Sequence, residues 1–170
     1  RRVVLIHAPS GFGKSTLAAQ WREELVRDGV AVAWLTIDDD DNNVVWFLPH
    51  LLKSLRRVRP ALAASLGQVL QEHGDHAGRY VLTTLIDEIH DDDDRIALVI
   101  DDWHRVSDPA TTAALGFLLE HGCHHMQIIV TSWSRAGLPV SRLRIQDELV
   151  EIGCESLCFN DSEARTFLND

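Results

Sequence analysis

The chain has 170 residues, of which 45% are hydrophobic and 25% are charged, a composition typical of one globular domain. Its 26 acidic residues outnumber its 16 basic residues, and the formal net charge of −10 argues against direct contact with a nucleic-acid backbone. No long apolar run is present, so we expect no membrane span.

The cysteines and the first residues bear on the setting of the protein. Three cysteines without a CxxC pair indicate a reducing, cytoplasmic environment and no disulfide framework. Arg1 and Arg2 lead directly into an apolar run, without a leader-like segment. We therefore expect residues 1–170 to form one cytoplasmic domain, cut from a larger multidomain regulator.

Apolar runs alternate with amphipathic stretches along the first third of the chain. Val3–Ile6 is a continuous apolar run, typical of a strand buried on both faces of a parallel sheet. Helical spacing over Lys14–Arg27 ends near Gly29, a helix-stop residue. Ala31–Ile37 then predicts a second strand, and residues 38–43 an acidic loop.

The middle of the chain is predicted to be helical. Three apolar stripes lie near residues 46–55, 62–70 and 81–89, and Gly74–Gly78 breaks the last two apart. The four aspartates Asp91–Asp94 then form a linker to the next strand.

The remaining elements complete an alternating pattern. Asp108 and Pro109 predict a helix start, with Asp108 as the cap, and this helix runs to about His121. The alternation of buried strands and helices predicts an α/β fold with a parallel sheet covered by helices on both faces. The other predicted elements are strands at Ile96–Ile100, Ile128–Val130 and Leu149–Ile152 and a final helix at 162–169.

A glycine-containing segment joins the first strand to the first helix, which is the context of a phosphate-binding loop. Glycines let backbone N–H groups point at a phosphate, Lys14 adds a positive charge, and the Ser15 hydroxyl can bind magnesium. Ala8 replaces the first glycine of the standard pattern. We predict that ATP or ADP binds with Mg²⁺ to Ser10, Gly11, Phe12, Gly13, Lys14, Ser15 and Thr16.

Two acids end the strand at Ile96–Ile100, as in a Walker B element. We assign Asp101 to the magnesium shell together with Ser15, and Asp102 to positioning or activating water. Lys14 and Asp102 are thus the catalytic candidates. His104 follows closely, and it either senses the phosphate or caps a loop.

Two other clusters of possible metal ligands are interpreted without a metal. The aspartate runs at residues 38–41 and 91–94 lack the spacing and glycine of a calcium loop, and we interpret them as solvated turns. The group His121, Cys123, His124 and His125 matches no tetrahedral zinc pattern.

Several of these motifs together resemble the nucleotide-binding domain of MalT-like regulators, signal-transducing ATPases of the STAND class related to AAA+ proteins. The likeness extends to members in which a serine/threonine kinase domain precedes the ATPase region. It implies a three-layer P-loop NTPase fold of five strands, with the first strand between the fourth and fifth. The segments that carry the resemblance are 7–15, 32–35 with 38–42, 99–104, 117–121 and 138–144.

One position departs from this family. In many such proteins an arginine that senses the γ-phosphate follows the equivalent of Thr131-Ser132, whereas Trp133 stands there in this chain. Trp133 either stacks on a neighbour or packs in the core. Other candidates for an anion contact are Arg135, Arg142 and Arg144.

The leading hypothesis is a switch operated by ATP and ADP within a larger regulator, with the nucleotide and other domains of the same polypeptide as partners and oligomerisation on activation. Any ATP hydrolysis is expected to be slow. The alternatives are an active ATPase or small-molecule kinase that uses the same loop, and an interaction domain that keeps the loop without using it.

Overall fold

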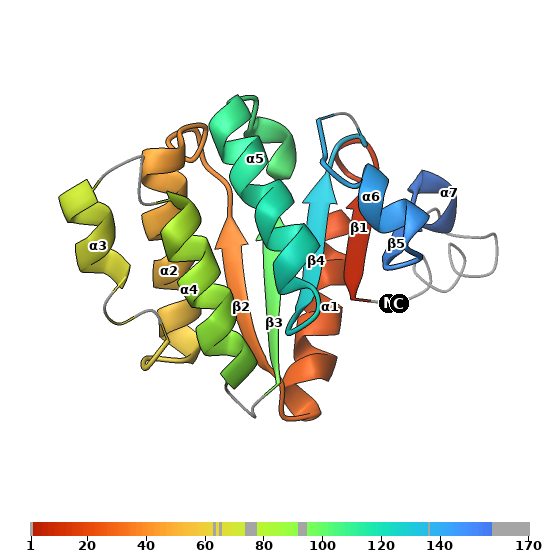
Figure 1. Ribbon diagram of the computed structural model, residues 1–170. Coiled ribbons are helices and arrows are strands. Elements are labelled where there is room, and N and C mark those ends of the chain that lie inside the picture. The colour runs from red at the N-terminus through yellow and green to blue at the C-terminus, as the bar shows by residue number, and fades with distance from the viewer. Residues whose placement is uncertain are drawn as a thin grey trace.

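The computed structural model describes residues 2–62, 64, 66–73, 78–91, 95–135 and 137–157. Its centre is a five-stranded sheet in the order β2-β3-β4-β1-β5, and every pairing is parallel. The predicted α/β fold is thereby confirmed, as is the position of the first strand between the fourth and fifth (Figure 1). The strands are β1 (Val3–His7), β2 (Ala31–Thr36), β3 (Ile96–Asp101), β4 (Gln127–Ser132) and β5 (Leu149–Ile152).

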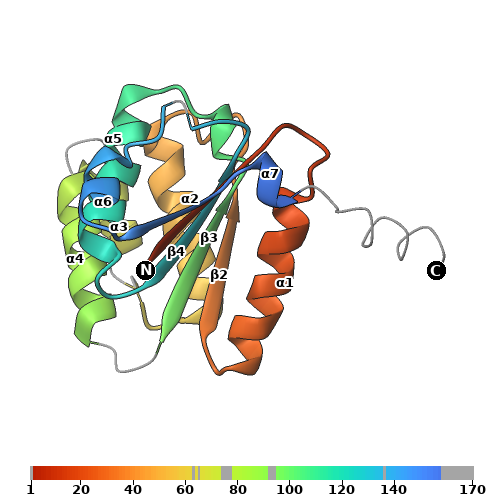
Figure 2. The ribbon, with the colours of Figure 1, turned by 90° about the vertical axis from the view of Figure 1, so that its right-hand side faces the viewer.

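Helices cover both faces of the sheet. Figure 2, which views the sheet from its edge, shows α1 and the short α7 on one face and the other helices opposite. The helices are α1 (Lys14–Arg27), α2 (Val44–Val58), α3 (Leu66–His73), α4 (Gly78–Asp91), α5 (Pro109–Phe117), α6 (Ser141–Ile145) and α7 (Cys154–Leu157). A 3-10 turn, η2 (Trp103–Arg105), and a π-helical turn, η3 (Leu118–Gly122), complete the described elements.

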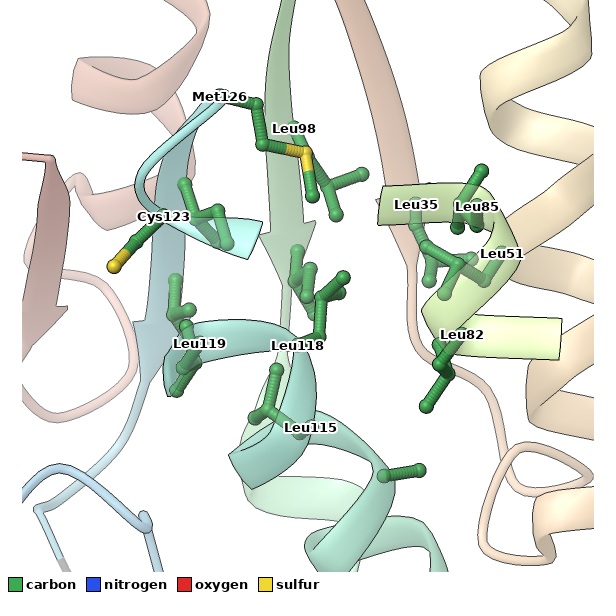
Figure 3. Packing of buried hydrophobic residues seen from close by; sticks show 14 of the residues in the cluster. Leu35, Leu51, Leu82, Leu85, Leu98, Leu115, Leu118, Leu119, Cys123 and Met126 are labelled. Atoms are coloured by element: carbon green, nitrogen blue, oxygen red, sulfur yellow. The ribbon is translucent and has the colours of Figure 1, made fainter. Parts of the chain in front are cut away.

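Two hydrophobic clusters hold these layers together, because successive side chains of a strand point to opposite faces of the sheet. Along β1, Val3 and Leu5 pack with α2, α4 and α5, whereas Val4 and Ile6 pack with Ala18 of α1. Figure 3 shows part of the larger cluster, in which Leu35, Leu51, Leu82, Leu85, Leu98, Leu115, Leu118, Leu119, Cys123 and Met126 meet. The strands are therefore buried on both faces, which explains their uninterrupted apolar sequences.

The predicted helix from Pro109 to about His121 is α-helical only as far as Phe117. Its continuation is the π-helical turn η3, and apolar periodicity does not separate the two because Leu118 and Leu119 face the core in either form. Asp108 caps α5 as predicted, since its carboxylate accepts a hydrogen bond of 2.7 Å from the Thr111 N–H. The predicted final helix at 162–169 lies outside the described residues.

The acidic loop after β2 corrects one interpretation. Asp41 is only 1% exposed, and its carboxylate accepts from the Asp38 N–H and lies 2.9 Å from His50 Nδ1. This aspartate is therefore a buried, hydrogen-bonded group of the loop and no solvated residue, although Asp38, Asp39 and Asp40 are exposed. Residue type alone did not separate these cases, because burial here depends on the packing of α2 over the loop.

Candidate phosphate-binding site

The segment between β1 and α1 crosses the carboxyl edge of the sheet, where parallel strands place their ligand sites (Figure 2). Gly11 and Gly13 have φ angles of 86° and 74°, in the left-handed region that favours glycine. Gly13 is also the N-cap of α1, and no side chain caps the helix. The backbone N–H groups and the positive end of α1 thus suit an anion such as phosphate.

Two side chains of the first turn of α1 form hydrogen bonds across the site. Lys14 is 6% exposed, and its amine donates a 3.0 Å hydrogen bond to the carbonyl oxygen of Pro9 across the loop. The Ser15 hydroxyl donates a 2.9 Å bond to Asp101 Oδ1. The two predicted magnesium ligands therefore meet directly, although 86 residues separate them in sequence.

The position of Asp101 follows from the strand register. All six residues of β3 are buried, and Ile100 pairs with Val130 of β4, so that Asp101 and Thr131 lie side by side at the ends of their strands. The Thr131 hydroxyl donates to the same Asp101 oxygen that Ser15 contacts. Asp101 is 6% exposed, so these two hydroxyl donors satisfy a carboxylate oxygen that is largely removed from water.

Asp102 has an unusual backbone. Its φ and ψ of 64° and 37° are left-handed, which costs a residue with a Cβ atom about 1 kcal/mol. Its N–H donates a 3.0 Å hydrogen bond to Thr131 Oγ1, which holds this conformation. Strained residues of this kind cluster at functional sites. Thr131 thus links both acids. Its role was not predicted from the sequence, in which the available signal was a hydroxyl at the end of an apolar strand.

His104 and Trp133 lie beside the two acids. Their rings stack with centroids 3.8 Å apart and planes inclined by 16°. Of the two alternatives predicted for Trp133, stacking on a neighbour is therefore the one observed, and packing in the core is not. Its side chain remains exposed. The pKa of His104 lies below the ordinary value because the ring is removed from water, an effect that the Asp102 charge opposes.

The arginine candidates are engaged elsewhere. Arg135 and Arg144 both pair with Glu151 of β5, at 3.3 Å and 2.5 Å, and Arg142 pairs with Glu120 at 3.2 Å. His7 lies 3.9 Å from Glu151, and burial, followed by the Arg135 charge, lowers its pKa. In the described part of the chain, the ion pairs of these three arginines are with Glu151 and Glu120 and not with residues of the predicted phosphate loop.

The residues of the His121–His125 group differ in their exposure to solvent. Cys123 is a buried free thiol whose pKa is raised by removal from water, whereas His121, His124 and His125 are exposed. Within the described ranges, one trio of side chains lies close enough to share an ion, namely Asp38, Asp41 and His50. No ion is implied by this trio, because Asp41 and His50 already satisfy each other.

A sizeable groove lies away from the phosphate loop. A groove of about 850 Å³ runs between α2 and α3, with Trp46, Leu52 and Leu70 among its lining residues. It contains none of the predicted site residues. No helix in the described part of the chain is both long and apolar enough to cross a bilayer.

Comparison with known proteins identifies the family and the relatives of this domain. Residues 1–130 match the AAA ATPase domain family. The chain is 77% identical over 170 residues to the serine/threonine-protein kinase PknK of Mycobacterium tuberculosis, covering all of this chain and 15% of that protein. It is 30% identical over 168 residues to the HTH-type transcriptional regulator MalT of Yersinia enterocolitica, covering 99% of this chain and 18% of that regulator.

Solved structures agree on the fold. Cdc6p from Pyrobaculum aerophilum has a TM-score of 0.53 at 17% identity, covering 88% of this chain and 38% of that one. A chain of Drosophila ORC bound to AT-rich DNA and Cdc6 has a TM-score of 0.51 at 10% identity, covering 99% and 57%. The resemblance to MalT-like regulators and to their serine/threonine kinase relatives is therefore confirmed, and the chain belongs to the AAA ATPase domain family.

Proposed function

We propose that this domain binds ATP or ADP with Mg²⁺ through residues 10–16 and acts as a nucleotide-operated switch in a larger cytoplasmic regulator. The observation that supports this most is the direct meeting of Ser15 and Asp101, at 2.9 Å, beside the uncapped start of α1. These oxygens suit Mg²⁺, which prefers hard ligands and is held in P-loop proteins by a loop hydroxyl and a strand-end acid.

The residues have separate roles in this proposal. Backbone N–H groups of Gly11, Phe12, Gly13 and the first turn of α1 bind the phosphates, and Lys14 exchanges its contact with Pro9 for a phosphate oxygen. Ser10 and Thr16 flank this cradle. Magnesium bound at Ser15 and Asp101 would neutralise the phosphate charge, and Asp102 would orient a water molecule.

Three features favour a switch over rapid turnover. Asp102 is shorter than the glutamate of fast ATPases, Trp133 replaces a sensing arginine, and Arg135 and Arg144 are already paired with Glu151. An arginine finger alone is worth about 10³ to 10⁵ in rate, so a site that works without one is expected to bind nucleotide with little hydrolysis. Other domains of the same polypeptide, or a second copy on oligomerisation, would read the bound state.

The size of the relatives supports this setting. The chain spans 15% of the length of PknK and 18% of the length of MalT, so residues 1–170 are proposed as one module of a longer protein. The net charge of −10 makes direct nucleic-acid contact by this module unfavourable. The output therefore depends on partner domains.

Calorimetric titration with MgADP and MgATP tests the proposal. Lys14→Ala removes a charged contact to phosphate and should weaken binding by about ten- to a hundredfold. Lys53→Ala is the matched control, because Lys53 is exposed on α2, outside residues 10–16. If Lys14→Ala and Lys53→Ala both bind ADP as the parent chain does, the loop is not the nucleotide site.

A further inference from the structure

The stacked rings of His104 and Trp133 have no place in the roles described so far. His104 belongs to the turn η2, which Trp103 anchors: that indole is 2% exposed and meets Phe47 edge-on at 5.8 Å. Trp133 follows β4 and stacks face to face on His104. The segments that follow the neighbouring strands β3 and β4 therefore hold the His104 imidazole ring in a defined plane.

This imidazole has an unused hydrogen-bonding atom. Nδ1 of His104 is buried and makes no hydrogen bond in the described part of the structure, and it lies 3.9 Å from Asp102 Oδ1. Leaving a buried polar atom unpaired reduces stability, and native proteins contain few such atoms. A ring that served only for packing would not need this nitrogen, so the loss of stability from leaving it unpaired indicates a function for His104.

The surroundings locate that function at the phosphate site. After burial, the charges that act on the His104 ring are those of Asp102, Arg105, Lys14 and Asp101. The Asp102 side chain is 32% exposed, whereas its backbone N–H is held by the Thr131 hydroxyl. A rotation that shortens the gap by about 1 Å brings Nδ1 and Oδ1 to ordinary hydrogen-bond distance.

We infer that His104 is a positioning residue for Asp102: Trp133 fixes its ring, and its Nδ1–H donates to the Asp102 carboxylate when a nucleoside triphosphate occupies the loop. This inference rests on the proposed function and deepens it. The His104–Asp102 pair has two arrangements, apart or hydrogen-bonded, and the second is selected by the γ-phosphate and not by ADP. In this arrangement the pair distinguishes ATP from ADP, a role that an arginine after β4 has in related domains.

Variants at position 104 identify the atom. The side-chain amide nitrogen of asparagine can occupy the place of Nδ1, whereas that of glutamine reaches toward the place of Nε2. His104→Ala and His104→Gln should lower the preference for a non-hydrolysable MgATP analogue over MgADP by about tenfold, and His104→Asn should restore most of it. His121→Asn is the control, because His121 is exposed and precedes β4 at the opposite edge of the sheet.

Trp133 provides a second readout. The chain has five tryptophans, so the Trp133 signal is obtained as the fluorescence of the parent minus that of Trp133→Phe. We expect the ATP analogue, but not ADP, to change this difference spectrum, and His104→Ala to abolish the change.

The outcomes separate the two proposals. If the parent binds both nucleotides and neither the preference nor the Trp133 signal depends on His104, or if glutamine rescues as well as asparagine, the inference is wrong. If the parent binds neither nucleotide, the proposed function fails and the inference falls with it. A tenfold loss that asparagine alone restores supports the assignment.

Discussion

Thr131→Val tests whether the hydroxyl that joins the two acids stabilises the site. Valine has nearly the same shape as threonine, so the change removes the hydroxyl while the packing of β4 is retained. Thr131 is fully buried, donates to Asp101 and accepts from the Asp102 N–H at 3.0 Å. The substitution therefore removes one bond to a charged group and leaves one partly buried N–H without its acceptor.

The magnitude follows from these two bonds. A hydrogen bond to a charged group contributes about 1.5–3 kcal/mol, and an unsatisfied N–H costs about 1–3 kcal/mol. Asp101 keeps the bond from Ser15, and contributions of neighbouring groups are not additive, so we expect a net loss of about 2–3 kcal/mol in the free energy of unfolding. For a domain of this size the loss corresponds to a melting temperature lower by roughly 5–10 °C.

Urea unfolding measures this loss, with an unchanged m value as evidence that the unfolding transition is the same. Thr83→Val is the control, because the Thr83 hydroxyl is exposed and donates to the Arg79 carbonyl of its own helix, α4. We expect this control to change the free energy of unfolding by less than about 0.5 kcal/mol. A Thr131→Val variant as stable as the Thr83→Val variant would refute the role of the hydroxyl.

Three further predictions concern the metal, the chemistry and the cap of α5. Asp101→Asn should weaken MgATP binding more than MgADP binding, because the ion bridges the β- and γ-phosphates, and equal magnesium dependence in titrations of variant and parent would remove Asp101 from the metal shell. Steady-state phosphate release by the 170-residue chain should be slow, and turnover well above about 1 s⁻¹ that Lys14→Ala abolishes would favour a working ATPase or kinase over a switch. Asp108→Ala should cost about 1 kcal/mol at neutral pH, measured by urea unfolding. Hydrogen bonds from Thr111 lower the Asp108 pKa from 3.8, so the stabilisation by the ionised carboxylate is present above that value. It is lost as the pH falls through the folded-state pKa, and the difference in unfolding free energy between variant and parent should shrink there. A constant difference down to pH 3 would contradict this cause.

The local elements of this domain were determined by the sequence itself. Uninterrupted apolar runs predicted the buried strands, because a strand covered on both faces has no solvent-facing position to fill with polar residues. The strand, glycine loop and helix predicted around Gly11 and Gly13 are present, and the phosphate site stays a prediction based on the backbone N–H groups that this order aims at an anion. Asp108 and Pro109 predicted the start of α5 for an equally local reason.

The two Walker motifs predicted that Ser15 and Asp101 share one site, whereas most other contacts between distant segments were decided by the tertiary structure. Periodicity carries no information on strand order or register, and these two place Asp101 against Ser15 and Thr131. The stacking of the His104 ring on Trp133 also could not be predicted from periodicity. Nor could the ion pairs of Glu151 with Arg135 and Arg144, two arginines that were predicted as candidates for an anion contact. The burial of Asp41 was missed because the side chain that satisfies it, His50, lies on the next helix. Sequence spacing reports what one segment can form, whereas the partner of a polar side chain depends on which segments the folded sheet brings together.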